Sequence, residues 1–135
     1  KIQKNGLEET IELIPWISHK DLIPIIKNSL LYFTVSRYEG LPLSVLEAMC
    51  LGKAIVATDV VGNRDCVSNE ENGFLIKKDD THGFADAVCR LIQDSDMRYK
   101  MEHNSRLIYS KGFDISINIP QLEAIYNGVA KLCHE

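Results

Sequence analysis

The amino-acid sequence predicts an α/β domain, a parallel sheet flanked by helices, and three observations support this fold class. Short apolar runs rich in strand-forming residues alternate with longer segments of helical periodicity, which is the pattern of βαβ units. The chain of 135 residues is long enough for one ordinary domain and too short for two. Its composition, 45% hydrophobic and 25% charged, is typical of a globular protein.

The first elements are an apolar stretch at residues 11–16 and a helix over residues 19–28. Ser18 can cap this helix, because its hydroxyl accepts a hydrogen bond from a free N–H of the first turn. Three apolar residues at helical spacing form the stripe that faces the core: Leu22, Ile25 and Ile26. We expect Trp16 to pack in the core or at its rim.

Three continuous apolar runs predict strands at residues 30–35, 54–57 and 73–76. We expect the first of them to be covered on both faces, as strands of parallel sheets are. A helix between the first two strands ends at Gly52, a residue type favoured just past a helix end. The predicted helices after the first strand span residues 43–51, 81–93, 96–109 and 117–133.

Charge and hydropathy exclude several classes of protein. The 15 Lys and Arg against 19 Asp and Glu give a net charge of −4, which argues against binding nucleic acid through bulk positive charge. No apolar run approaches the roughly 20 residues that cross a bilayer, and no signal peptide opens the sequence. Four cysteines lack metal or redox spacing, which predicts free thiols and a cytoplasmic location: Cys50, Cys66, Cys89 and Cys133.

Residues 36–49 carry the candidate site, because a strand end, a glycine-containing loop and a helix start follow one another there. Ligands of parallel sheets bind outside the carboxyl ends of the strands. We expect Pro42 at the first helical position, with the N–H groups of Leu41 and Leu43 aimed at this crevice. A helix N-terminus carries partial positive charge that can hold a phosphate, and Gly40 lets a ligand approach the backbone.

Glu47 is the one charged side chain of a helix that is otherwise apolar nearly all round and is therefore expected to be buried. A buried carboxylate needs a specific partner. Because helical side chains lean toward the N-terminus, Glu47 can reach the crevice and accept hydrogen bonds from a diol such as a ribose. Pairing with Arg37 or Lys53 is the alternative, and the residues alone leave both open.

Glu39 and Glu47 do not match the acid pair of a glycoside hydrolase. Their backbones would lie about 12 Å apart if helical throughout, whereas hydrolase carboxyl groups lie about 5 to 9.5 Å apart. We therefore expect the two carboxylates to hold opposite ends of one elongated ligand.

The string from Ser36 to Thr58 resembles the glutamate–seven residues–glutamate signature of the retaining glycosyltransferases of family 4, which have the two-lobed GT-B fold. The matching residues are Ser36-Arg37, Glu39-Gly40-Leu41-Pro42, Leu46-Glu47-Ala48-Met49 and Gly52-Lys53-Ala54-Ile55-Val56-Ala57-Thr58. The resemblance continues to the terminal helices. It implies that residues 1–135 form a single, partial, Rossmann-like C-terminal donor-binding domain, with the N-terminal acceptor domain and the basic residues for the diphosphate absent.

The resemblance also implies roles for individual residues. Glu39 contacts the hydroxyls of the donor sugar and is the candidate catalytic residue, while Glu47 binds the nucleotide ribose. Ile17 lies in the loop that meets the base. The loop that faces the sugar and diphosphate comprises Gly40, Leu41, Pro42 and Leu43. Where family members often have Gly-Gly-x-Pro-Glu, this chain has a variant that looks like one of bacterial capsule and surface-polysaccharide transferases: Val61-Gly62-Asn63-Arg64-Asp65.

The implied activity is transfer of a hexose, with retention, from a nucleotide diphosphate sugar to an acceptor hydroxyl in cell-surface polysaccharide or glycolipid synthesis. A UDP-sugar is favoured over GDP-mannose, and neither a metal nor a cofactor is implied. The expected acceptor is a saccharide or lipid-linked saccharide bound by the missing domain, with the whole protein at the inner face of the plasma membrane. The chain alone is expected to bind the donor without turnover. A non-catalytic nucleotide-sugar-binding module and a GT-B sugar-nucleotide epimerase are the alternatives.

Overall fold

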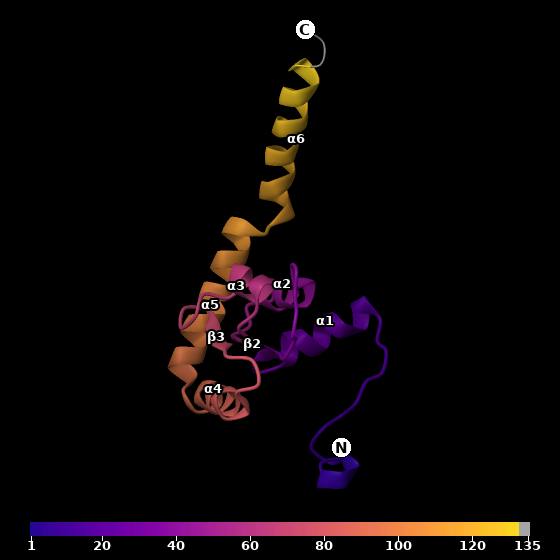
Figure 1. Cartoon of the computed structure of the whole chain (residues 1–135), viewed down its shortest axis with the longest axis vertical. Coiled ribbons are helices and arrows are strands. Elements are labelled where there is room, and N and C mark those ends of the chain that lie inside the picture. Colours follow the sequence, from indigo (N-terminus) through magenta and orange to yellow (C-terminus); the bar gives the residue numbers. More distant parts are fainter. Residues whose placement is uncertain (133–135) are drawn as a thin grey trace.

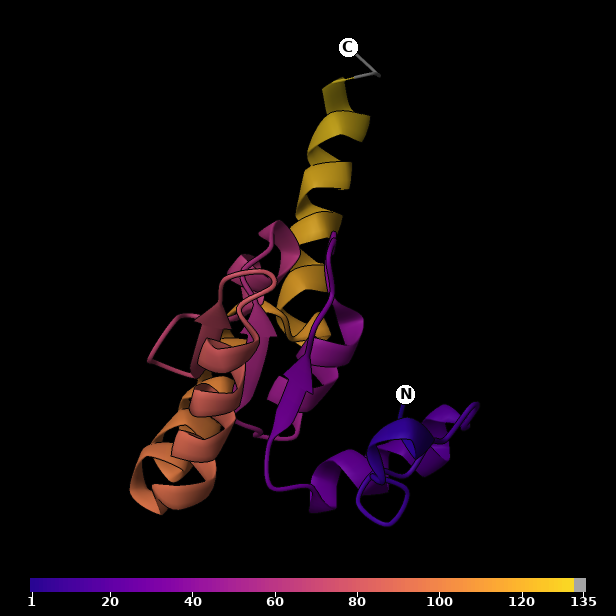
Figure 2. The ribbon, with the colours of Figure 1, turned by 60° about the horizontal axis from the view of Figure 1, so that its bottom comes forward.

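The computed structural model describes residues 1–132 and contains a parallel sheet of order β1-β2-β3 with helices on both faces (Figure 1). The strands are β1 (Tyr32–Thr34), β2 (Ile55–Thr58) and β3 (Gly73–Ile76). Figure 2 shows them side by side and running in the same direction. In the parallel pairing, Tyr32 lies opposite Ile55 and Ile55 opposite Gly73. The predicted fold class is confirmed. Cys133, which is the last residue of the helix predicted at 117–133, lies outside the described residues.

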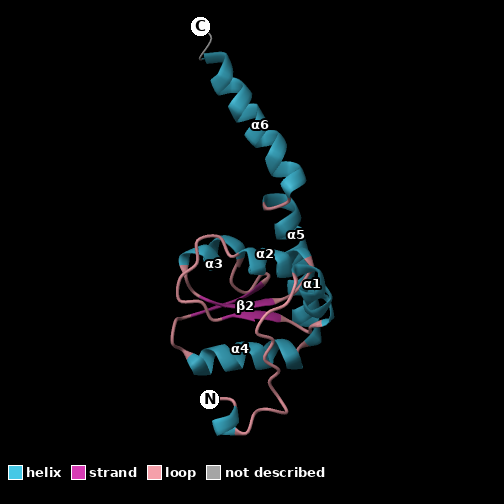
Figure 3. Cartoon of the chain, turned by 90° about the vertical axis from the view of Figure 1, so that its right-hand side faces the viewer, coloured by secondary structure: helices cyan, strands magenta, loops and turns pink. Residues whose placement is uncertain are grey.

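Two layers of helices cover the sheet (Figure 3). On one face lie α1 (His19–Asn28), α2 (Leu43–Cys50) and α3 (Val61–Cys66), and α4 (Thr81–Gln93) lies on the other. The long helix α5 (Ser95–Gly112) contacts both α4 and α2, and α6 (Ile115–Leu132) projects away from the other elements. A single turn of 3-10 helix, η1 (Gln3–Asn5), lies near the N-terminus.

The core lies on both sides of β2, whose four residues are all buried. Ile55 and Ala57 pack in the cluster beneath α1 and α2, while Val56 packs with Phe74 and Leu91 on the α4 side. This alternation follows from the pleat, which sends successive side chains to opposite faces. The central strand is therefore covered on both faces, as a strand of a parallel sheet requires.

Helix boundaries agree with the local signals in the sequence. α1 and α4 have the predicted bounds, and α2, α5 and α6 differ from the predictions by a few residues. Ser18 accepts a hydrogen bond from the Asp21 N–H, as a cap of α1 should, and Gly52 has a φ of +67° just past α2. The short helix α3 lies in a segment for which the sequence pattern predicts neither a helix nor a strand.

The expectation that residues 30–35 are covered on both faces is wrong. β1 is only three residues long and is the edge strand of the described sheet, so one of its sides has no neighbouring strand. Phe33 is 58% exposed and touches Phe84 of α4 edge-to-face at 5.8 Å between ring centroids. Val35 is also exposed. An apolar run thus predicts a strand, but it does not show whether other strands and helices bury that strand.

Two other apolar segments are exposed. Residues 11–16 form no regular element, and Trp16 is 81% exposed, so the expected packing of its ring in the core is wrong. No strand of the described residues pairs with this segment, so its side chains are not part of the packed sheet and helix layers. The apolar positions of α6 are exposed too, namely Leu122, Ile125, Tyr126 and Val129.

Candidate functional site

The candidate site lies where the loops after β1, β2 and β3 meet, at the carboxyl edge of the sheet. A hollow of about 360 Å³ opens there on the α4 side. Its lining includes Arg37 after β1, Thr58 at the end of β2, and Lys77 after β3. In open α/β sheets, ligands bind outside the carboxyl ends of the strands.

The loop after β1 is held in place by its neighbours at the same edge. The Thr58 hydroxyl donates to the Ser36 carbonyl at 2.5 Å, and the Ser36 hydroxyl lies 3.0 Å from that of Thr34. The N–H of Gly62, in the first turn of α3, donates to the Glu39 carbonyl at 3.2 Å. These contacts position Glu39 and Gly40 before any ligand arrives.

Gly62 allows the closest of these approaches. A Cβ at this position would lie 2.3 Å from the Gly40 carbonyl oxygen, and the nearest Glu39 backbone atom would lie at 2.9 Å. Only a residue without a side chain lets α3 touch this loop. In the sequence, Gly62 stands out only as part of the variant motif after β2. A glycine inside a short helix is a sign of such close backbone contact, although it does not identify the neighbour.

The N-terminus of α2 follows directly after the loop from β1 and lacks a side-chain cap. Pro42 is the N-cap residue, so its expected place as the first helical residue is wrong, although the helix begins at Leu43 as the predicted range 43–51 has it. α1, α4 and α5 are each capped by a side chain, whereas no side chain bonds the first turn of α2. Uncapped N–H groups at a ligand-binding edge are suited to an anion.

The helix α2 is buried on one side only. Val45, Ala48 and Met49 are fully buried, whereas Leu43, the first residue of the helix, is 68% exposed. The expectation of a helix buried all round is therefore wrong, because its first turn reaches the uncovered carboxyl edge. That exposure leaves the first turn accessible to a ligand.

Glu47 has a protein partner that differs from both alternatives. Its Oε1 lies 2.9 Å from Nε2 of His19, the first residue of α1. Arg37 instead donates to Asp79 at 3.3 Å. The ammonium of Lys53 donates to two backbone carbonyls at the end of α1, those of Lys27 at 2.8 Å and Ser29 at 2.7 Å. Pairing of Glu47 with Arg37 or Lys53 is thus wrong.

The other predicted site residues lie in the loop before α2 and just before α1. Glu39 is half-buried, and among residues 1–129 its carboxylate takes part in no ion pair or hydrogen bond. Gly40 and Leu41 are exposed in the loop. Ile17 is half-buried and stands two residues before His19. The structure therefore brings Glu39 and Gly40 together with Gly62, and Glu47 together with the start of α1.

Residues of the variant motif after β2, at positions 61–65, form hydrogen bonds that hold the end of β2 and the turn after it. The buried Asn63 amide donates to the Thr58 carbonyl at 2.8 Å, which secures the end of β2. Arg64 donates to both oxygens of Asp59 at 2.5 and 3.1 Å. This hydrogen-bonded guanidinium lowers the pKa of the Asp59 carboxyl below its usual value. Asp65 is exposed.

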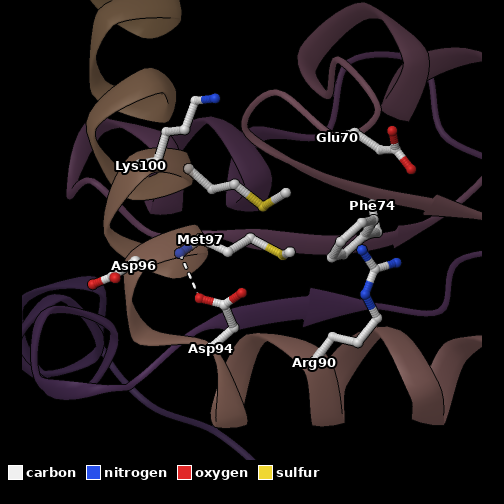
Figure 4. A pocket seen from close by; sticks show the side chains of 8 residues that line it. Glu70, Phe74, Arg90, Asp94, Asp96, Met97 and Lys100 are labelled. Atoms are coloured by element: carbon white, nitrogen blue, oxygen red, sulfur yellow. Dashed lines mark hydrogen bonds between the residues drawn. The ribbon is translucent and has the colours of Figure 1, made fainter.

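A second hollow, of about 540 Å³, lies between the end of α4 and the start of α5 (Figure 4). The Arg90 guanidinium lies over the Phe74 ring, 4.6 Å from its centroid. Asp94 accepts from the Met97 N–H at 2.8 Å and so caps α5, as Asp80 caps α4. Both carboxylates therefore serve the starts of helices.

Within residues 1–132, no helix combines the length and the apolar character needed to cross a bilayer.

Comparisons with known proteins agree with this architecture. The family described as "Glycosyl transferases group 1" matches residues 1–108. A UDP-Gal:alpha-D-GlcNAc-diphosphoundecaprenol alpha-1,3-galactosyltransferase of Escherichia coli is 31% identical over 121 residues, which are 90% of this chain and 30% of the relative. The capsular polysaccharide biosynthesis glycosyltransferase CapM of Staphylococcus aureus is 31% identical over 111 residues, 82% of this chain and 29% of the relative.

Solved structures show the same fold. Anabaena Alr3699/HepE in complex with UDP-glucose superposes with a TM-score of 0.82 at 26% identity, covering 93% of this chain and 35% of that one. Sucrose-phosphate synthase from Thermosynechococcus elongatus superposes with a TM-score of 0.90 at 24% identity, covering 97% of this chain and 33% of that one. The structural neighbours are glycosyltransferases of the GT-B type. The chain spans about a third of the length of the curated relatives it matches.

Proposed function

The chain belongs to the group 1 glycosyltransferases, and from this premise we propose that residues 1–135 bind the nucleotide diphosphate sugar donor of a retaining hexosyltransferase. The acceptor-binding domain and the basic residues for the diphosphate would belong to other parts of a longer protein. The length of the curated relatives supports this division, because the matched region is about a third of each.

The observation that carries the proposal is the uncapped N-terminus of α2, with Glu39 in the loop before it and Glu47 on the following turn of the helix. A nucleotide diphosphate sugar has an anionic centre with a polyhydroxyl group on each side. The first turn of α2 suits the anion, while Glu39 and Glu47 suit the hydroxyls of the sugar and the ribose. Ile17, close to His19 in sequence, would lie at the base. A UDP-sugar is the favoured donor, because a structural neighbour at 26% identity is described with UDP-glucose.

In the proposed reaction, the bond between the anomeric carbon and the diphosphate oxygen breaks, and a bond from that carbon to the acceptor oxygen forms on the same face. The acceptor hydroxyl proton passes to the departing phosphate oxygen, so the chain needs no separate base. Helix N–H groups aimed at the diphosphate stabilise its growing negative charge, which is the kind of contribution usually largest in catalysis. Glu39 would orient the donor sugar through its hydroxyls.

We propose a saccharide or a lipid-linked saccharide as the acceptor. The Escherichia coli relative is named for a diphosphoundecaprenol-linked acceptor, and the Staphylococcus aureus relative for capsule synthesis. A lipid-linked acceptor would bring the reaction to a membrane surface. Peripheral association with the inner face of the plasma membrane, and the cytoplasmic location that it requires, are parts of the same proposal.

Ligand-observed NMR of the 135-residue chain with UDP and with GDP tests the proposal, beside the variants Glu47→Ala and Glu123→Ala. Glu123 lies on α6, away from the sheet (Figure 1), and serves as the matched control. Loss of charge-assisted bonds to two hydroxyls should weaken UDP binding about 10- to 100-fold in Glu47→Ala only. If a folded sample binds neither nucleotide, the proposed donor site is wrong. UDP binding that Glu47→Ala leaves unchanged removes the ribose role of Glu47.

A further inference from the structure

On the basis of the proposed donor site, we propose that His19 is a positioning residue, which orients the Glu47 carboxylate so that the carboxylate selects a nucleotide with an intact ribose diol. From the sequence alone, His19 has no more than a structural role at a helix start. The bond between its Nε2 and Glu47 Oε1 joins residues 28 positions apart in the sequence.

The packing of α1 on α2 brings the two side chains together. His19, Leu22 and Ile26 recur at intervals of three and four residues, so they share one face of α1. Ile26 belongs to the buried cluster with Val45 and Met49 of α2, and Leu22 packs against that cluster. Because His19 continues the same stripe toward the N-terminus of α1, its ring lies beside α2.

The far end of α1 is secured independently. Lys53, buried just after α2, donates to the carbonyls of Lys27 and Ser29 at the end of α1. Carbonyls at a helix C-terminus carry partial negative charge, which an ammonium neutralises. Thus α1 is fixed to the α2 region at one end by Lys53 and at the other by His19. The position of the imidazole is therefore set by the packing of a whole helix.

The chemistry of the pair leaves Glu47 free to bind a ligand. An ionised carboxylate only accepts hydrogen bonds, so the His19 Nε2 in contact with it must carry the proton. That bond occupies Oε1 and leaves Oε2, together with the second lone pair of Oε1, for two hydroxyl donors. The Glu47 side chain is 31% exposed and the His19 side chain 68% exposed, so the pair is open to a ligand. The neighbouring acid Asp21 accepts a hydrogen bond from the Ser18 hydroxyl, whereas the His19 ring contacts Glu47.

Two nucleotides, one with and one without the ribose hydroxyls, distinguish a positioning role of His19 from a general effect of its substitution on folding. The dissociation constants of UDP and of 2′,3′-dideoxyuridine diphosphate are measured by titration of the 135-residue chain and three variants: His19→Ala, His19→Gln and His82→Ala. The amide of Gln places a donor near the position of Nε2, which makes His19→Gln the rescue variant. His82, an exposed histidine in the first turn of α4, provides the matched control.

His19→Ala should weaken UDP binding about two- to tenfold, the effect of losing one orienting hydrogen bond. It should leave the dideoxy nucleotide unaffected, His19→Gln should recover most of the loss, and His82→Ala should match the wild type. Equal weakening of both nucleotides, no weakening of UDP, or no recovery in His19→Gln overturns the positioning role. A wild-type chain that binds both nucleotides equally, or binds neither, overturns the ribose site of Glu47 itself, and the two failures are therefore distinguishable.

Discussion

Replacing Gly62 by alanine should destabilise the protein, although the same change at an open helical position stabilises it. The α3 backbone has ordinary helical φ at this residue, so intrinsic helix propensity favours alanine by about 1 kcal/mol. The new Cβ would lie 2.3 Å from the Gly40 oxygen, whereas ordinary contacts begin at 3.4 Å. The helix and the loop must therefore separate by about 1 Å, which breaks the 3.2 Å bond from Gly62 N–H to the Glu39 carbonyl.

The lost bond and the overpacking together predict a net loss of about 1–3 kcal/mol in the free energy of unfolding. With a urea dependence of about 2 kcal/mol per M, the midpoint should fall by about 0.5–1.5 M. Urea unfolding followed by circular dichroism measures this shift, with Gly112→Ala as the matched control. Gly112 lies at the end of α5, where an added Cβ would meet no atom within 4 Å, so alanine there should change stability by less than about 0.5 kcal/mol. If Gly62→Ala is as stable as Gly112→Ala, the close approach of α3 to the loop does not exist in solution.

Three further outcomes follow from other contacts. Lys53→Met keeps the aliphatic stem but removes two bonds to helix carbonyls, and should lower the free energy of unfolding by about 1.5–3 kcal/mol in urea titrations. Gly73→Ala places a Cβ 2.1 Å from the Ile55 oxygen between paired strands, and should cost about 3 kcal/mol or abolish folding by circular dichroism. Burial raises the pKa of the Cys66 thiol from 9.0 to about 11, so the folded state keeps a proton that the unfolded chain loses. Stability should therefore decline as pH rises from about 9 to about 11, and at pH 8 iodoacetamide should modify exposed Cys89 before Cys66, as read by mass spectrometry.

Local interactions explain why so much of the secondary structure could be predicted. Three signals involve residues only a few positions apart, so a short stretch of sequence is enough to recognise them. They are the Ser18 cap, the glycine past α2, and the apolar runs of β2 and β3. The position of the candidate site could be predicted for the same reason. A strand end, a glycine and a helix start fall within a few residues of Gly40, and the topology of a parallel sheet places them at its ligand-binding edge.

Burial was harder to predict, because it depends on elements distant in sequence. The apolar composition of β1 is that of a covered strand, yet Phe33 is largely exposed since β1 has a neighbour on one side only. Trp16 is exposed for a related reason, because no described strand pairs with its segment. Apolarity shows that a residue is suited to burial, whereas the arrangement of layers decides whether it is buried.

By itself, the amino-acid sequence determined the fold class, most helix and strand positions, and the short segment that holds Glu39, Gly40 and Glu47. Only the tertiary structure decided that His19 contacts Glu47 across 28 positions and that Gly62 touches the loop at Gly40. The physical reason is range, since capping, periodicity and turn formation act within about four residues. The partners of the site come instead from the packing of α1 and α3 against α2 and its preceding loop, which depends on the whole core.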